Sequence, residues 1–174
     1  MKQERISALF TAMLEYFAGD PRRCQHFIKV HSLARQLGLA EGLDERTQEL
    51  LELAALLHDC GIKPAEAKFG MNNGRLQEEY GPAAARELLE PLALPAADVE
   101  RICYLVGHHH TYTNMDGLDY RILVEADFLV NFYEDALPQK NIAAAVRKIF
   151  TTRAGKEMAQ AMYALPRAAA LTAD

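Results

Sequence analysis

The sequence is poor in cysteine, and it lacks both a long apolar run and an excess of positive charge. Its 3 cysteines, Cys24, Cys60 and Cys103, are odd in number and far apart, which favours free thiols in a reducing compartment over a disulfide framework. No apolar run approaches the length that spans a membrane, and the charged N-terminal residues lack the apolar region of a signal peptide. We therefore expect a soluble, cytoplasmic protein without a membrane partner.

The charge balance limits the classes of partner. With 24 acidic and 19 basic residues, the net charge is −5 at pH 7, so the chain has no general attraction for nucleic acid or for an anionic membrane surface. Apolar residues make up 50% of the 174 positions, which is enough for one domain with a sizeable core.

Apolar residues recur with helical spacing along nearly the whole chain, and no segment alternates as a strand does. We expect an all-α bundle in which Asp20 and Asp44 cap helices. The stretch 61–75 is expected to be irregular, and Gly81-Pro82 is expected to interrupt a helix. The expected helices cover residues 4–18, 21–37, 45–58, 76–89 with that interruption, 96–109, 118–135, 139–150 and 152–164.

No repeat, linker or low-complexity segment divides the chain. We therefore expect residues 1–174 to form a single helical domain. The chemically interesting residues lie within about 20–135, and the C-terminal helices follow at 139–164. An alanine-rich tail after them is expected to fray.

His58 and Asp59 stand side by side where an apolar helix meets Gly61. Two hydrophilic groups at the inner end of such a helix are costly to bury unless something pairs with them. Neighbouring residues on a helix point about 100° apart, so both can reach one ion, or bridge two, only where the helix unwinds. Gly61 allows that unwinding. Cys60, next to the pair, is interpreted as a core residue.

Helical-wheel positions separate further candidate ligands from bystanders. His26 lies on the apolar face of its helix, where it is either a ligand or a hydrogen-bonded core residue, whereas His31 lies to the side and is interpreted as supporting or structural. Asp127 is expected to face inward, because Arg121 and Glu125, an i,i+4 pair, would mark the solvent side. A buried carboxylate needs a cation or several donors, so the alternative for Asp127 is a structural pair with an arginine or a helix N-terminus.

Three consecutive histidines close the apolar helix that ends near residue 109. His109 shares a face with the apolar residues and points inward if the helix continues past Gly107. His108 lies toward the edge, and His110 begins the following loop. We expect the triplet to take part in the site, although its pattern does not assign the individual roles.

Taken in chain order, these residues resemble the H…HD…D pattern of the HD-domain superfamily of metal-dependent phosphohydrolases. The resemblance is carried by segments 26–34, 56–63 and 124–127, covers roughly residues 20–135, and implies a helical bundle. It also implies four metal ligands: His26, His58, Asp59 and Asp127. Histidine and carboxylate together suit Mn, Fe(II), Co, Ni, Zn or Mg, with no thiolate to select among these divalent ions.

Some members of the superfamily hold a second metal through an extra histidine before a Gly-Ala-type helix and through a His-His pair. His108-His109 resembles that pair, but Gln77 stands four residues before Gly81, where the extra histidine would be. The resemblance thus implies one ion and leaves a second open. The residues after His110 lack the Gly-Tyr-Pro signature of cyclic-dinucleotide phosphodiesterases, so that activity is not expected.

The resemblance implies hydrolysis of a phosphate ester or anhydride of a nucleotide or another small phosphorylated metabolite. A divalent ion would lower the pKa of a bound water and neutralise phosphate oxygens, so that metal-bound hydroxide attacks phosphorus near neutral pH. Asp59 would also orient that water. Lys63 and either His108 or His109 would bind phosphate or protonate the leaving oxygen.

Two further cations, Lys68 and Arg75, share the stretch 61–75 with Lys63, and loops commonly carry substrate specificity. A solvated charged loop is the alternative for this stretch. The alternative function is a metal-containing module that senses a nucleotide without turnover, and the third is a purely structural bundle. The expected partner is a small phosphorylated substrate rather than extended nucleic acid, with a homodimer left open.

Overall fold

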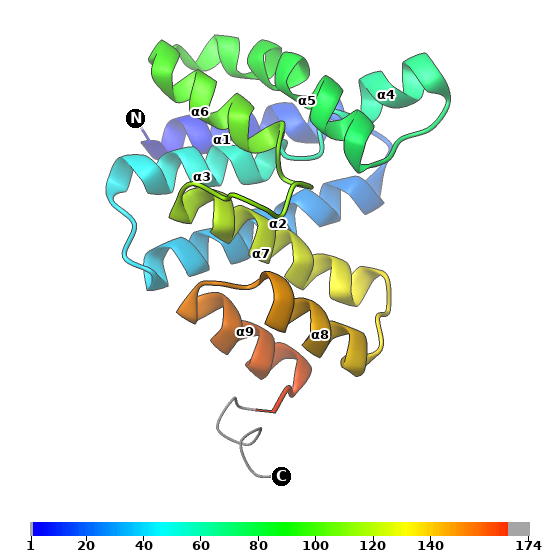
Figure 1. Cartoon of the computed structure of the whole chain (residues 1–174). Coiled ribbons are helices and arrows are strands. Elements are labelled where there is room, and N and C mark those ends of the chain that lie inside the picture. The colour runs from blue at the N-terminus through cyan, green and yellow to red at the C-terminus, as the bar shows by residue number, and fades with distance from the viewer. Residues whose placement is uncertain (1, 167–174) are drawn as a thin grey trace.

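The computed structural model describes residues 2–166, and this part of the chain contains nine α-helices (Figure 1). None of these residues forms a strand, so the expected all-α fold class is confirmed. The helices are α1 (Lys2–Tyr16), α2 (Pro21–Ala40), α3 (Glu45–Leu57), α4 (Ile62–Phe69), α5 (Gly74–Leu89), α6 (Ala96–Val106), α7 (Leu118–Glu134), α8 (Gln139–Ile149) and α9 (Arg153–Tyr163), with a short 3-10 helix, η1 (Glu90–Leu92), after α5. The alanine-rich tail lies outside the described residues beyond Leu165 and Pro166. The assignment of 1–174 to one domain stays a prediction.

Side-chain caps begin two of the site-bearing helices, as the sequence predicted. The carboxylate of Asp20 accepts a hydrogen bond from the backbone N–H of Arg23, and Pro21 takes the first position of α2. Asp44 accepts backbone N–H groups at the start of α3 in the same way. Such caps pair N–H groups that the start of a helix leaves without an intrahelical partner.

Helices α2, α3 and α7 form the middle of the bundle, with α1, α5 and α6 on one side and α8 and α9 on the other (Figure 1). Helix α7 is buried on nearly all sides, which explains why apolar residues surround it instead of forming one stripe. One cluster of buried apolar side chains joins all the described α-helices except α4. The three central helices are therefore held rigidly against one another by packing.

The prediction that residues 61–75 are irregular was wrong in part. Residues Ile62–Phe69 form α4, which buries Ile62 and Ala65 and ends at Gly70 in the left-handed conformation, at φ 68°. Tertiary packing of these two side chains outweighs the weak local helical signal of a segment that contains Pro64. The stretch from Gly70 to Asn73 is irregular, as expected.

The prediction that Gly81-Pro82 interrupts a helix was also wrong, because α5 continues through both residues. A Cβ on Gly81 would lie 2.7 Å from Cγ1 of Val106 in α6, and a Cβ on Gly61 would overlap the carbonyl oxygen of Gln77 in α5. Both glycines therefore permit close packing against α5 or α6, and Gly81 does so within a continuous helix.

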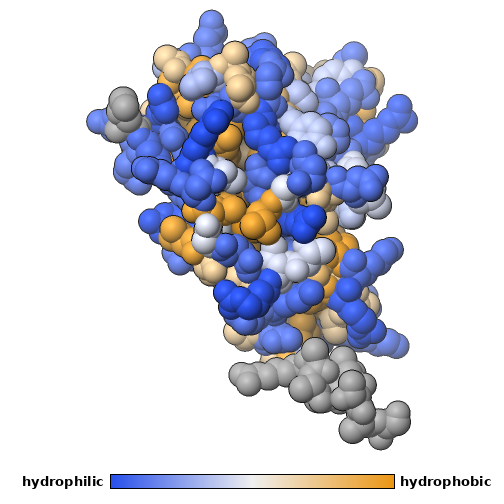
Figure 2. Space-filling view, turned by 60° about the vertical axis from the view of Figure 1, so that its left-hand side comes forward, coloured by the Kyte–Doolittle hydropathy of each residue, from blue (hydrophilic) through white to orange (hydrophobic). Residues whose placement is uncertain are grey.

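Among residues 2–166, no helix is both long and apolar enough to cross a bilayer. The face in Figure 2 is largely hydrophilic, and apolar side chains reach it in separate groups.

Candidate metal centre

The turn between α3 and α4 carries the adjacent pair His58 and Asp59. In this turn the N–H of Cys60 donates to the carbonyl of Leu57 at 2.8 Å, and the N–H of Ile62 donates to that of Asp59 at 3.0 Å. Because the α-helix has already ended, the two neighbouring side chains can face the same point. His58 is fully buried there, and the Asp59 side chain is 19% exposed.

His26 from α2 and Asp127 from α7 complete a cluster around the same point. The Nε2 atoms of His26 and His58 are 3.1 Å apart. The Nε2 atom of His26 lies 3.1 Å from Asp127 Oδ1 and 3.5 Å from Asp59 Oδ2. Bonds of about 2.0–2.2 Å to one ion place neighbouring ligand atoms roughly 3 Å apart, so the cluster has the dimensions of a metal site.

The tautomers of two histidines follow from their backbone partners. The Nδ1–H of His58 donates to the carbonyl of Ala55 at 2.8 Å, and the Nδ1–H of His109 donates to that of Val106 at 2.8 Å. A carbonyl oxygen can only accept, so in the neutral rings Nε2 carries the lone pair. Both Nε2 atoms are thereby oriented as ligand atoms toward the cluster.

A carboxylate orients the third histidine. Nδ1 of His26 lies 2.9 Å from Oε2 of Glu134, whose other oxygen pairs with Lys29 at 2.5 Å. Histidine ligands of metal ions commonly donate their second ring N–H to a carboxylate, which fixes the ring and increases its basicity. Glu134, at the end of α7, is a supporting residue that the sequence interpretation missed.

The charge of the cluster favours a bound cation. Burial raises the pKa of Asp59, but His58, His109 and His26 together lower it by more than burial raises it. The carboxyl therefore stays ionised. Burial also raises the pKa of Asp127, but the hydrogen bond with His26 and the charges of His58 and His26 together outweigh that effect and lower it. Burial lowers the pKa of His26, yet Asp127 and Asp59 raise it to about 9. Two buried carboxylates thus attract positive charge to the point where the Nε2 atoms meet.

An orphaned nitrogen supports the same interpretation. Nε2 of His109 is buried without a hydrogen-bond partner among the described residues, and it lies 3.6 Å from Asp59 Oδ1. That distance is too long for a hydrogen bond. A buried ring nitrogen without a partner, beside ionised carboxylates, fits a site completed by a cation or a proton better than it fits a purely structural network.

The comparison with protein families gives a match to the HD domain family over residues 23–149. The chain belongs to the HD domain family. The matched range contains every residue of the cluster and accounts for most of the chain. Neither the comparison with curated proteins nor that with solved structures gave a match. The membership expected from the sequence is confirmed. The HD domain family is of the metal-dependent hydrolase type.

Within this HD domain, a second group of possible ligands borders the first. Asp59, His109 and His110 offer ligand atoms that lie close together. However, the Nε2–H of His110 donates to Oε1 of Gln77 at 2.8 Å, and Gln77 also donates to Asn72. Gln77 therefore engages one ring nitrogen of His110, and the other lies 3.4 Å from the hydroxyl of Tyr112.

The structure does not bring Lys63 or His108 to the cluster. Nζ of Lys63 donates to the carbonyl of Tyr16 at 2.6 Å and lies over the ring of that residue. His108 stacks on Tyr104 and donates through Nδ1 to the carbonyl of the same residue. Lys68 is likewise engaged elsewhere, with a tyrosine hydroxyl of α5. The catalytic roles expected for Lys63 and His108 stay predictions.

The remaining histidine and cysteine candidates agree with their expected structural roles. His31 lies 3.4 Å from Glu52, a buried carboxylate that also accepts a hydrogen bond from Gln48. Cys60 is buried and donates to the carbonyl of Gly81, and burial raises the pKa of its thiol. Neither residue offers a ligand atom to the cluster.

A polar cleft of about 460 Å³ opens onto the centre at His26 and Asp59. Its rim includes Arg22 and Arg23, which the sequence interpretation did not single out. Arg22 precedes His26 by four residues, and that spacing places both on one side of α2. This four-residue spacing was the signal in the sequence that could have placed Arg22 near His26.

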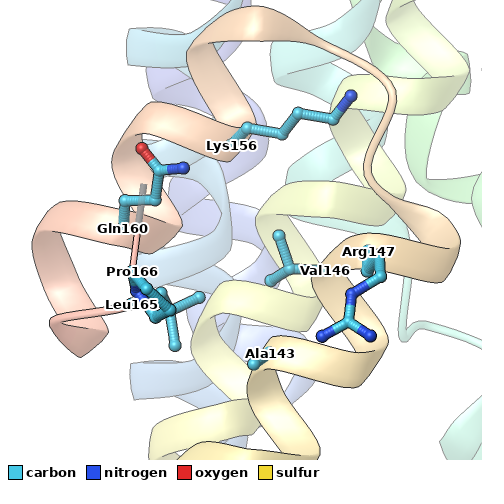
Figure 3. Close-up of a pocket in the computed structure, with 7 residues that line it drawn as sticks. All are labelled: Ala143, Val146, Arg147, Lys156, Gln160, Leu165 and Pro166. Atoms are coloured by element: carbon cyan, nitrogen blue, oxygen red, sulfur yellow. The ribbon is translucent and has the colours of Figure 1, made fainter. Parts of the chain in front are cut away.

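Another hollow lies between α8 and α9, away from the centre (Figure 3). Arg147, Lys156 and Gln160 surround an apolar floor that includes Val146 and Leu165. No histidine, cysteine or carboxylate is among its described lining residues, so it offers no ligands of the kind found at the cluster.

Proposed function

We propose that this HD domain is a metal-dependent phosphohydrolase that acts on a phosphate ester or anhydride of a small phosphorylated metabolite, nucleotides included. The observation that supports this proposal is the convergence of three histidine Nε2 atoms and two ionised carboxylates at one largely buried point. Each histidine is oriented from behind by a hydrogen bond to Nδ1. Preorganised ligands of this kind are typical of metal sites.

The residues around the centre would divide the work between binding and proton transfer. A single divalent ion would be held by the four ligands of the HD pattern: His26, His58, Asp59 and Asp127. When bound, such an ion neutralises phosphate oxygens and lowers the pKa of a neighbouring water. Oδ1 is the Asp59 oxygen nearer to His109, whereas Oδ2 is the one nearer to His26 and His58, so Oδ1 would orient the attacking water.

His109 is the best-placed proton donor for the leaving oxygen. Burial lowers its pKa, but Asp59 raises the pKa above the ordinary value, which favours a proton on Nε2. That nitrogen has no competing partner among the described residues. A general acid within reach of the leaving group commonly contributes about 10²–10⁴-fold in rate.

The test is phosphate release from a panel of nucleotides, sugar phosphates and pyrophosphate by the purified chain. The protein is loaded with Mn, Fe(II), Co, Ni, Zn or Mg, and a chelator-treated sample is the control. We expect turnover of at least one compound, abolished by the chelator and restored by metal. If no compound is hydrolysed while one nucleotide binds at micromolar concentration, the chain is a sensing module and the proposal is wrong.

A further inference from the structure

The cleft beside the metal centre has a composition that indicates what enters it. Its floor includes the ligands His26 and Asp59, and its walls come from α2, α7 and the segment before α5. Ile62 is the single apolar side chain among its described lining residues, and none of them is a phenylalanine, tyrosine or tryptophan. The cleft therefore favours a ligand that is polar over most of its surface.

Two of the acidic groups of the cleft, Glu134 and Asp20, are paired with basic side chains of the protein. Glu134 lies between His26 and Lys29. Asp20 accepts the backbone N–H of Arg23 and pairs with its guanidinium at 3.3 Å. These carboxylates consequently do not oppose an entering anion as unpaired charges would.

The two arginines of the rim differ in what they contact. Arg23 is tied to Glu66 in α4 at 2.6 Å as well as to Asp20, so it links α2 to α4. Arg22 is exposed, and it makes no hydrogen bond or ion pair with any residue from 2 to 166. Arg22 is thus an uncommitted guanidinium on the cleft that leads to the metal ligands, and a guanidinium matches the oxygens of a phosphate group.

The neutral walls add hydrogen-bonding groups instead of a stacking surface. The amide of Asn131 donates to Asp127, and the amide of Asn72 bridges Glu66 and Gln77. Each amide keeps further donor or acceptor capacity. Such walls suit hydroxyl groups, and none of the described lining residues offers an aromatic ring on which a nucleobase could stack.

We propose that this cleft is the substrate site, that Arg22 contacts the phosphate of the substrate, and that the site takes a compact, non-aromatic phosphate monoester. The assignment rests on the proposed phosphohydrolase function and narrows it. Arg23 acts as a positioning residue that keeps the start of α2 against α4. The nucleobase of a nucleotide lies outside the cleft and contributes no affinity.

The first experiment measures binding of inorganic phosphate to the whole manganese-loaded chain by titration calorimetry. Arg22→Ala is compared with Arg147→Ala, a matched loss of an exposed arginine on α8. Removal of a charge-assisted contact should weaken phosphate binding by about tenfold or more in Arg22→Ala, and Arg147→Ala should bind like the wild type. Arg22→Glu should weaken binding further. Equal affinity in all four proteins would overturn the assignment of Arg22.

The second experiment compares kcat/KM for ribose 5-phosphate and adenosine 5′-monophosphate, which share a sugar phosphate and differ by the base. We expect the nucleotide to be no better a substrate than the sugar phosphate. A bound, stacked base would typically add about tenfold or more, and such a preference for the nucleotide would overturn the substrate class. If neither these esters nor any compound of the wider panel is hydrolysed but phosphate binding depends on Arg22, the proposed hydrolysis fails and the cleft assignment stands. If hydrolysis occurs but is insensitive to Arg22→Ala, the cleft assignment fails and the proposed hydrolysis stands.

Discussion

Two carboxylates on α7, two residues apart, are both buried and yet have different surroundings. Glu125 is fully buried, and its carboxylate accepts the backbone N–H groups of Thr151 and Thr152 at 2.6 and 2.9 Å, together with the Thr152 hydroxyl. Asp127 is 5% exposed, and its neighbours are histidine nitrogens, one asparagine amide and a second carboxylate. Glu125 joins α7 to the start of α9, whereas Asp127 faces the metal centre.

The difference shows why burial of a charged group does not by itself identify a site. A buried carboxylate is costly unless donors or a cation compensate it. The donors of Glu125 belong to the fold and are always present, because they begin α9. The compensation for Asp127 and Asp59 includes histidines whose Nε2 lone pairs also need a cation. A candidate site is therefore recognised by buried polar atoms that have no hydrogen-bond partner within the protein.

The sharpest test of this contrast is Asp127→Ala. Loss of one of the four ligands should remove most of the bound metal and reduce activity by at least about a thousandfold, since the chemistry depends on the ion. Metal content by elemental analysis and phosphate release are measured on protein whose helical circular dichroism is unchanged. Asp59→Ala should behave in the same way. Wild-type metal content in either variant would refute the ligand assignment.

Glu125→Ala should have the opposite profile. It leaves the buried N–H and hydroxyl of Thr152 without this acceptor, at about 1–3 kcal/mol each, so the free energy of unfolding should fall by roughly 2–6 kcal/mol. Urea denaturation measures this loss. Glu125→Gln, which keeps an acceptor oxygen, should lose less. The amount of metal bound per folded molecule should not change. A loss of metal from the folded protein would show that Glu125, like Asp127, supports metal binding.

The same pair of residues shows how far sequence reasoning reaches. Glu125 and Arg121 were taken to mark the solvent side of α7, and that was wrong. Glu125 is buried, while Arg121 donates to the carbonyl of Met115 and not to Glu125. The inward direction of Asp127 was correct nevertheless. In a helix buried on both sides, charge spacing does not locate the solvent, because donors from distant segments such as Thr151 cannot be seen in the local sequence.

The ligand pattern was readable because it is local and chemically distinctive. Histidine and aspartate at the end of an apolar helix, with the helix break beside them, require partners whatever the details of the fold. The all-α class followed from periodicity. The helix α4 and the continuity of α5 through Gly81-Pro82 were missed, because both depend on which helix packs against these residues. Arg22 and Glu134 were missed for the same reason, since their importance depends on their distance from His26.

A smaller effect is expected from Glu134→Gln, which tests the support of a ligand and not a ligand itself. The amide still accepts the Nδ1–H of His26 but carries no charge, so metal affinity should fall by about 10–100-fold. The dissociation constant of Mn(II) is the measurement. Glu157→Gln, an exposed carboxylate on α9 paired with Arg153, is the matched control and should retain wild-type affinity. An unchanged constant in Glu134→Gln would restrict Glu134 to a surface ion pair with Lys29.

The smallest effect is expected from His108→Ala, because the contrast between paired and unpaired groups recurs within the histidine triplet. The ring of His108 is held by Tyr104 at the edge of the bundle, whereas Nε2 of His109 is buried and unpaired beside Asp59. His108→Ala should therefore change kcat by no more than about twofold, while His109→Ala should lose about 10²-fold or more, the contribution of a general acid. Thermal melting is measured beside activity, because a core histidine would reveal itself by a large fall in Tm with activity per folded molecule retained. If His108→Ala is instead the damaging change, His108 is the proton donor. The unpaired nitrogen of His109 then has a structural role, and the assignment of the proton donor to His109 is wrong.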